Sequence, residues 1–225
     1  MSTLIKTGLI TAIAVAFGCG VASSSSKEIV DIGGFAPVEV ESSNAKGIQT
    51  AVFAGGCFWG VEAVFEHVKG VTDVKSGYAG GDAKSADYEE VSGGATGHAE
   101  SVKVTFDPSK VSYVQLLTVF FSVAHDPTEL NRQGPDVGPQ YRSAIFYIDD
   151  EQKKLAKDYI DGINKSKVLP KPVVTQVVAL DKFYEAEEYH QDFMRKNPDH
   201  PYIVYHDKPK VEALKKKFSA LYAEK

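Results

Sequence analysis

Cys57 is the residue of this 225-residue chain whose surroundings best suit chemistry. It follows an apolar run and two glycines, and it precedes Phe58, Trp59 and a helical pattern of apolar residues. A sulfur at the start of a helix lies near free backbone N–H groups and the positive end of the helix dipole, which favour a thiolate over a thiol. We therefore predict that Cys57 is a nucleophile, rather than the inert buried cysteine common in protein cores.

Glu100 is the candidate proton donor. It stands at the start of an alternating stretch in which Val102, Val104 and Phe106 share one face. If the strand extends back to Glu100, its carboxyl group lies at the end of a core-facing row, and loss of water raises its pKa. Such a carboxylic acid stays protonated near neutral pH and can act as a general acid. The alternative is a solvated glutamate at the end of the strand.

Strands and helices that must position these groups are intermixed along the chain. The predicted strands are short apolar or alternating runs at 49–54, 71–78, 100–106, 141–148 and 173–180. The predicted helices follow capping signals or helical spacing and cover about 57–69, 112–124, 150–163, 185–196 and 209–221. Because the order lacks a regular β-α-β repeat, we predict an α+β fold, a two-layer sandwich with a central mixed β-sheet and a ferredoxin-like core.

The first 22 residues have the pattern of an export signal. Lys6 precedes an apolar run at 9–17, which is too short to span a bilayer. The sequence A-F-G-C ending at Cys19 resembles the lipobox of bacterial lipoproteins, although Ala16 stands where a larger aliphatic residue is usual. Either Cys19 is acylated and tethers the protein to a membrane, or a cut near Ala22 removes it. A buried N-terminal helix of a cytosolic protein is the remaining alternative.

We therefore predict export to the periplasm or cell envelope. Residues 23–47 mix Ser, Gly, Pro and charge without lasting periodicity, which indicates a linker, and the folded domain spans 48–225. The formal net charge of −5 gives no basic excess, so nucleic acid is not an expected partner.

Other chemistries compete for the same residues. The six histidines are scattered, and the single Glu187-x-x-His190 lacks the second copy of a di-iron site, so no metal is expected. A cysteine hydrolase would combine Cys57 with a histidine and an Asp or Asn. However, Phe58 and Trp59 suit an apolar methyl or thioether better than they polarise a carbonyl group. A thiol-bearing methionine-binding module without turnover is the third alternative.

Several motifs occur in a fixed order over most of the chain. They are G-G-C-F-W-G at 55–60, G-Y-A-G-G at 77–81, G-H-A-E at 97–100, H-D-P-T at 125–128, Q-G-P-D-V-G-P-Q-Y-R-S at 133–143 and A-E-E-Y-H-Q at 186–191. Together they resemble the A-type peptide-methionine sulfoxide reductases. The resemblance implies that 48–225 is a catalytic domain that repairs methionine S-sulfoxide in oxidised proteins and reduces free methionine sulfoxide.

The resemblance also implies residue roles. Cys57 attacks the sulfoxide sulfur and becomes a sulfenic acid, while Glu100 delivers a proton to the sulfoxide oxygen.

Substrate binding falls to the residues around this pair. The resemblance implies that Phe58 and Trp59 hold the substrate methyl group, that Tyr88 and Tyr141 hydrogen-bond the sulfoxide oxygen, and that Asp136 helps to shape the site.

The chain departs from many family members in its cysteines. Those members carry one or two resolving cysteines in a glycine-rich C-terminal tail, whereas no cysteine follows Cys57 here. We therefore predict that an external thiol reduces the sulfenic acid, either a thioredoxin-like or glutaredoxin-like protein or a small thiol. No bound cofactor is expected, and we expect a monomer.

Overall fold

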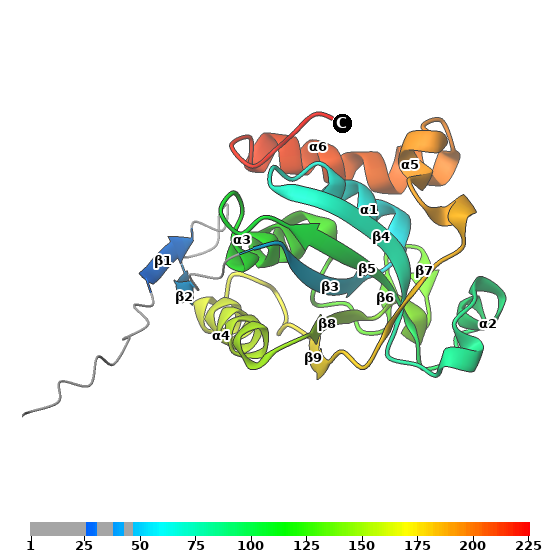
Figure 1. Ribbon diagram of the computed structural model, residues 1–225, viewed down its shortest axis with the longest axis horizontal. Coiled ribbons are helices and arrows are strands. Elements are labelled where there is room, and N and C mark those ends of the chain that lie inside the picture. Colours follow the sequence, from blue (N-terminus) through cyan, green and yellow to red (C-terminus); the bar gives the residue numbers. More distant parts are fainter. Residues whose placement is uncertain (1–25, 31–37, 43–46) are drawn as a thin grey trace, which may run out of the picture.

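The structure is a computed structural model that describes residues 26–30, 38–42 and 47–225 (Figure 1). The predicted export signal and Cys19 lie outside the described residues. Strands β1 (Ser26–Val30) and β2 (Val38–Ser42), both within the predicted linker, pair antiparallel. No helix in the described ranges is long and apolar enough to cross a membrane.

A six-stranded sheet forms the centre of the molecule, in the order β10-β4-β5-β3-β8-β9. Its strands are β3 (Gln49–Gly55), β4 (Val71–Ala79), β5 (Ala99–Phe106), β8 (Ser143–Tyr147), β9 (Gln176–Ala179) and β10 (Phe183–Glu185). All neighbours are antiparallel except β8 and β9. That parallel pair is joined through a helix, as a parallel crossover requires. The predicted mixed sheet and α+β class are confirmed.

The described part of the chain also forms six α-helices, which are labelled in Figure 1. They are α1 (Phe58–Glu66), α2 (Tyr88–Ser92), α3 (Tyr113–Val119), α4 (Asp150–Ser166), α5 (Phe193–Lys196) and α6 (Lys208–Lys217). A π-helical turn, Phe120–Ala124, extends α3, and a second, Ile203–Asp207, leads into α6. A small antiparallel pair, β6 (Arg132–Gln133) and β7 (Asp136–Val137), lies between the first of these turns and β8.

Capping side chains start two helices where the sequence predicts them. Ser112 and Gln115 form a reciprocal capping box at the start of α3. The Asp149 side chain accepts a hydrogen bond from the Gln152 backbone N–H at 2.7 Å and starts α4. These bonds satisfy N–H groups that have no partner within the helix, which explains why the local signals were sufficient.

Strand β3 is buried on both faces. On the helix side, the ring of Phe53 stacks between Phe65 and Phe120, with centroid distances of 5.1 and 5.0 Å. This side belongs to the main core, which also holds buried residues of α1, α3, α4 and α6. On the opposite side, Val52 and Ala54 belong to a smaller apolar cluster. The strand that leads to Cys57 is therefore held tightly, because close-packed interiors allow little displacement.

The predicted helix over 185–196 is wrong. The segment instead contributes the edge strand β10, a 3₁₀ turn (Glu188–His190) and the short helix α5. The Gln191 side chain accepts from the Ser76 backbone N–H at 3.0 Å and donates to the Ser76 carbonyl at 2.9 Å. Pairing with β4 thus satisfies the polar groups of this segment, and tertiary contacts override its helical spacing.

Candidate active site

Cys57 is the N-cap residue of α1, and only Gly56 separates it from the end of β3. The two residues before Cys57 are glycines, and a side chain at either position would collide with a neighbouring residue. A β-carbon on Gly55 would lie 3.0 Å from the His125 ring, and one on Gly56 would lie 2.6 Å from the Gln133 β-carbon. Gly56 also has a φ of +90°, which side chains of L-residues disfavour. The predicted junction of strand, turn and helix is confirmed.

His125 forms a rigid support beneath this turn. Its Nδ1 lies 3.0 Å from the Phe120 carbonyl, and its Nε2 lies 2.7 Å from the Ser143 hydroxyl. Burial lowers the pKa of His125 to about 4, so the ring is neutral at neutral pH. Because a carbonyl only accepts hydrogen bonds, Nδ1 carries the hydrogen and Nε2 accepts from Ser143. This fixed tautomer indicates a structural role.

Glu100 lies beside the start of α1, buried on the helix side of β5. The Phe58 backbone N–H donates a hydrogen bond to its Oε2 at 3.0 Å. Burial raises the pKa of Glu100 to about 8, and the Asp136 carboxylate raises it further, whereas the Phe58 N–H opposes this shift. The alternation of β5 therefore predicted correctly both the burial of Glu100 and the direction of its pKa shift.

The predicted thiolate is wrong for the resting site. Cys57 is buried, and this burial raises the pKa of its thiol well above the usual value. The carboxyl groups of Glu100 and Asp207 raise the pKa further. The Trp59 backbone N–H and Lys210 oppose them without prevailing. Loss of hydration outweighs the helix start, whose effect is about 1 kcal/mol or less at exposed sites.

Tyr88 and Tyr141 lie close enough to Glu100 and Cys57 to interact with them electrostatically. Burial is the main cause that raises the pKa values of Tyr88 and Tyr141, and both Glu100 and Cys57 raise them further. Both hydroxyl groups therefore remain protonated donors at neutral pH. The backbone N–H of Tyr88 donates to Glu187 at 2.9 Å, which fixes the start of α2.

Aromatic side chains form one wall of the site. Phe58 is 1% exposed and packs against His190 with a centroid distance of 5.0 Å. Trp59 is only partly buried, and its indole stacks on Phe193 with centroids 3.7 Å apart. Tyr202 meets the Trp59 ring edge-on at 5.8 Å. Trp59 is thus the more accessible member of the predicted methyl-binding pair.

Polar contacts hold this wall in place. The Trp59 indole N–H donates to His190 Nδ1 at 3.1 Å, so the neutral ring carries its hydrogen on Nε2. Burial lowers the pKa of His190, which favours that neutral form. In the described part of the chain, this Nε2 has no hydrogen-bond partner. The Tyr202 hydroxyl donates to the Asp136 carboxylate, which is half-buried in β7.

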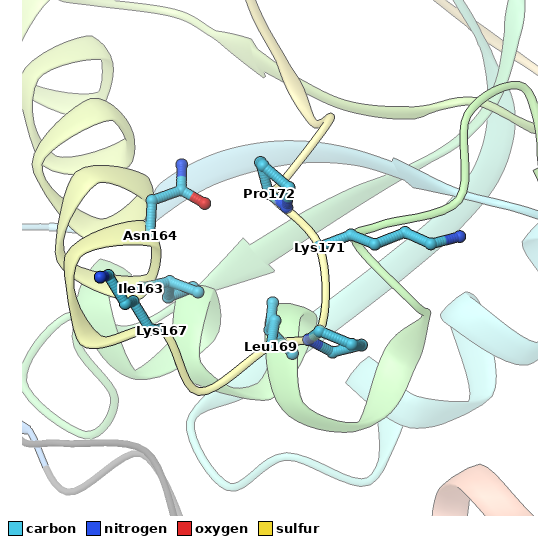
Figure 2. Close-up of a pocket in the computed structure, with 7 residues that line it drawn as sticks. Ile163, Asn164, Lys167, Leu169, Lys171 and Pro172 are labelled. Carbon is cyan, nitrogen blue, oxygen red and sulfur yellow. The ribbon is translucent and has the colours of Figure 1, made fainter.

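The structure therefore assembles the seven predicted residues Cys57, Phe58, Trp59, Tyr88, Glu100, Asp136 and Tyr141 around the start of α1. Sequence reasoning missed Phe193, Tyr202 and Asp207. Phe193 starts the four-residue helix α5, and Tyr202 and Asp207 lie at the two ends of a π-helical turn, so no long helical period marks them. The pocket in Figure 2, at the end of α4, contains none of the predicted site residues.

The arrangement combines a buried thiol, a neutral carboxylic acid, two hydroxyl donors and an apolar wall. It suits sulfur attack on an apolar group whose leaving oxygen needs a proton, which is the chemistry of a thiol-dependent reductase. Among the described residues, no group of three or more His, Cys, Asp or Glu side chains is placed to hold a metal ion.

Comparison with known proteins gives the family. Residues 49–222 match the family described as peptide methionine sulfoxide reductase. The chain is 59% identical over 186 residues to peptide methionine sulfoxide reductase MsrA 2 of Mesorhizobium japonicum, covering 83% of this chain and 95% of that protein. It is 50% identical over 207 residues to MsrA 2 of Synechocystis sp., covering 92% and 96%.

Solved structures agree. Mxr1 from Saccharomyces cerevisiae in reduced form has a TM-score of 0.61 at 35% identity, with 71% of this chain and 90% of that chain covered. Methionine sulfoxide reductase A of Corynebacterium diphtheriae has a TM-score of 0.58 at 32% identity, with 69% and 77% covered. The chain belongs to the A-type peptide methionine sulfoxide reductases. It reduces methionine sulfoxide to methionine.

Glu100→Gln tests the protonation of the acid without reference to catalysis. The pKa of Glu100 rises from 4.5 in the unfolded chain to about 8 in the folded protein. Protonated Glu100 therefore contributes its full stabilisation of the fold below pH 4.5, and this stabilisation is lost as the pH rises through 8. Gln keeps the shape and does not ionise. We expect the free energy of unfolding in urea to match the wild type at pH 5 and to exceed it by about 2–4 kcal/mol at pH 9.

The matched control is Glu212→Gln, at an exposed position of α6, which should leave the difference between the two pH values as in the wild type. A Glu100→Gln protein whose stability follows the wild type at both pH values would contradict the neutral acid.

Proposed function

We propose that Cys57 is the nucleophile and Glu100 the general acid of this reductase. The supporting observation is the 3.0 Å hydrogen bond from the Phe58 N–H to Glu100, which holds the acid beside the residue that follows the thiol. Burial of both groups keeps both protons in the resting site. A sulfoxide oxygen is a poor leaving group as an anion, so a proton held ready for it lowers the barrier.

The reaction conserves atoms and electrons. The Cys57 sulfur forms a bond to the sulfoxide sulfur as its own proton leaves, and Glu100 protonates the sulfoxide oxygen. Transfer of that oxygen to Cys57 breaks both the original sulfur–oxygen bond and the new sulfur–sulfur bond, which releases methionine. Cys57 becomes a sulfenic acid, oxidised by two electrons, while the sulfoxide sulfur is reduced by two. The thiol proton restores Glu100 through the site or solvent.

We propose that the predicted binding residues divide between the two ends of the sulfoxide. Phe58 and Trp59 form the apolar surface for the methyl group, with Trp59 in direct contact because it is the more exposed. Tyr88 and Tyr141 donate hydrogen bonds to the oxygen, which gains charge in the transition state. Asp136 shapes the pocket through its bond to the Tyr202 hydroxyl.

An external thiol resets the enzyme. Cys57 is the last cysteine of the chain, so no later residue can resolve the sulfenic acid as a disulfide. Two equivalents of a thiol reduce it: the first releases water and forms a mixed disulfide with Cys57, and the second frees the Cys57 thiol. A thioredoxin-like protein, a glutaredoxin-like protein or a small thiol satisfies this chemistry.

We also propose that the sheet and helices form a two-layer sandwich with a ferredoxin-like core. The element order β3-α1-β4-β5-α3-β8 and the strand order β4-β5-β3-β8 support this proposal, because they combine two β-α-β units in one antiparallel arrangement. We further propose that the enzyme is a monomer.

The proposed location is the periplasm or cell envelope. Support comes from the sequence pattern of 1–22, with a membrane tether through Cys19 if the lipobox is used, and from the serines that begin the 23–47 linker. In this proposal, 48–225 is the catalytic domain.

A single-turnover experiment tests the nucleophile. Purified protein without reductant, mixed with methionine S-sulfoxide, should release about one equivalent of methionine and gain one sulfenic acid at Cys57. Amino-acid analysis and dimedone labelling with peptide mass spectrometry measure these products. Cys57→Ser should give neither, whereas Cys19→Ser should behave as the wild type. Acyl-enzyme formation from esters would point to a hydrolase, and binding without methionine release would point to a binding module.

The rate of the same single turnover tests the acid. Because the acid must be protonated, the wild-type rate should fall as the pH rises through about 8, where Glu100 ionises. Glu100→Gln should lower the rate at pH 7 by about 10²- to 10⁴-fold and abolish this decline. A rapid-quench series from pH 6 to 9 measures both effects. A Glu100→Gln enzyme at full speed would refute the assignment.

The mass of the mature protein from its native host tests the export proposal. We expect an N-terminus at Cys19 with attached acyl chains, or one near residue 23 after ordinary cleavage. A chain that retains unprocessed Met1 would exclude both.

A further inference from the structure

A buried ion pair lies under the first turn of α1. Asp207 is 0% exposed and ends the π-helical turn Ile203–Asp207, and its Oδ1 lies 3.2 Å from Lys210 Nζ in α6. A β-carbon on Gly60 would lie 2.1 Å from this Oδ1 and 2.8 Å from this Nζ. The charged ends of both side chains therefore pack directly against the backbone of Gly60, which is three residues after Cys57.

This ion pair costs free energy of folding. Within the described residues, Asp207 Oδ2 has no hydrogen-bond partner although it is buried. An unpaired oxygen of a buried carboxylate loses its hydration without replacement, and apolar residues of similar volume often replace such pairs without loss of stability. Since Gly60 leaves the space into which this carboxylate fits, the placement points to a role at the adjacent site.

The charged groups that affect the ionisation of Cys57 belong to several elements of the fold. Glu100 of β5 and Asp207 disfavour its ionisation, and Lys210 favours it. The groups that in turn act on Asp207 are Lys210, Asp136 and His206. Lys210 keeps 23% of its side chain exposed, so it stays in contact with water when its partner is removed.

We propose that Asp207 and Lys210 are positioning residues that tune the balance between thiol and thiolate at Cys57, with Asp207 neutralising Lys210 and so lowering the thiolate fraction of the resting sulfur. The proposal rests on the assignment of Cys57 as the nucleophile. A protonated sulfur resists adventitious oxidation, because peroxide attacks the thiolate. This protection matters in a chain whose reactive cysteine has no later cysteine to resolve it.

Asp207→Asn is the direct test, since Asn keeps the shape and removes the charge. Lys210 then acts alone on Cys57, and the thiol pKa should fall by about one pH unit. At pH 8, below the thiol pKa, the rate of alkylation by iodoacetamide follows the thiolate fraction and should rise about tenfold. Peptide mass spectrometry of the full-length protein separates Cys57 from Cys19.

The double variant Asp207→Asn/Lys210→Met separates electrostatics from loosened packing. Removal of the lysine charge should bring the alkylation rate down from that of the single variant toward that of the wild type, because Asp207 raises the Cys57 pKa more than Lys210 lowers it. Lys216→Met, at an exposed position of the same helix, is the control and should alkylate as the wild type. The fluorescence of Trp59, the one tryptophan, reports whether the site remains folded.

Two outcomes would overturn the proposal: an Asp207→Asn protein that alkylates at the wild-type rate, or a double variant that stays as fast as the single one. Alkylation reads the thiol without turnover. A failure here is therefore distinguishable from a failure of Cys57 in the single-turnover experiment.

Discussion

The hydrogen bond from the Phe58 N–H to the Glu100 carboxyl group is the contact on which the site depends. It joins the first turn of α1 to β5, so strand register and helix start are fixed relative to each other. Because the Phe58 N–H group donates to the Glu100 oxygen, it is not free to donate to the Cys57 sulfur. The acid and the thiol are thereby held close in a region without water, where both retain their protons.

Burial explains how acidic groups are tolerated around one sulfur. Glu100 and Asp207 both disfavour a negative charge on Cys57, and Asp136 in turn disfavours one on Glu100. In water such groups would ionise and repel one another, whereas burial shifts Glu100 toward its neutral form. Lys210 adds a compensating charge at the edge of the site. In the proposed mechanism, the resting enzyme thus holds on Glu100 the proton that the sulfoxide oxygen needs.

Local signals predicted the elements that depend on nearby residues. The capping box at Ser112, the strand-to-helix junction at Cys57 and the alternation that buries Glu100 all follow from contacts within a few residues or from the two-residue period of a strand. The helix expected over 185–196 failed because Gln191 and β10 satisfy their polar groups on the edge of β4, which lies more than 100 residues away. No local pattern contains that information.

By itself, the sequence determined the family, through ordered motifs, and the need for an external thiol, through the absence of a cysteine after Cys57. The tertiary structure decided the protonation of that cysteine. Helix position predicted a thiolate, but ionisation depends on desolvation and on charges such as Asp207, which reaches Gly60 from the C-terminal part of the chain. These contributions to the Cys57 pKa come from segments that are distant in the sequence and are brought together by packing. Only the folded chain therefore determines whether the sulfur is a thiol or a thiolate.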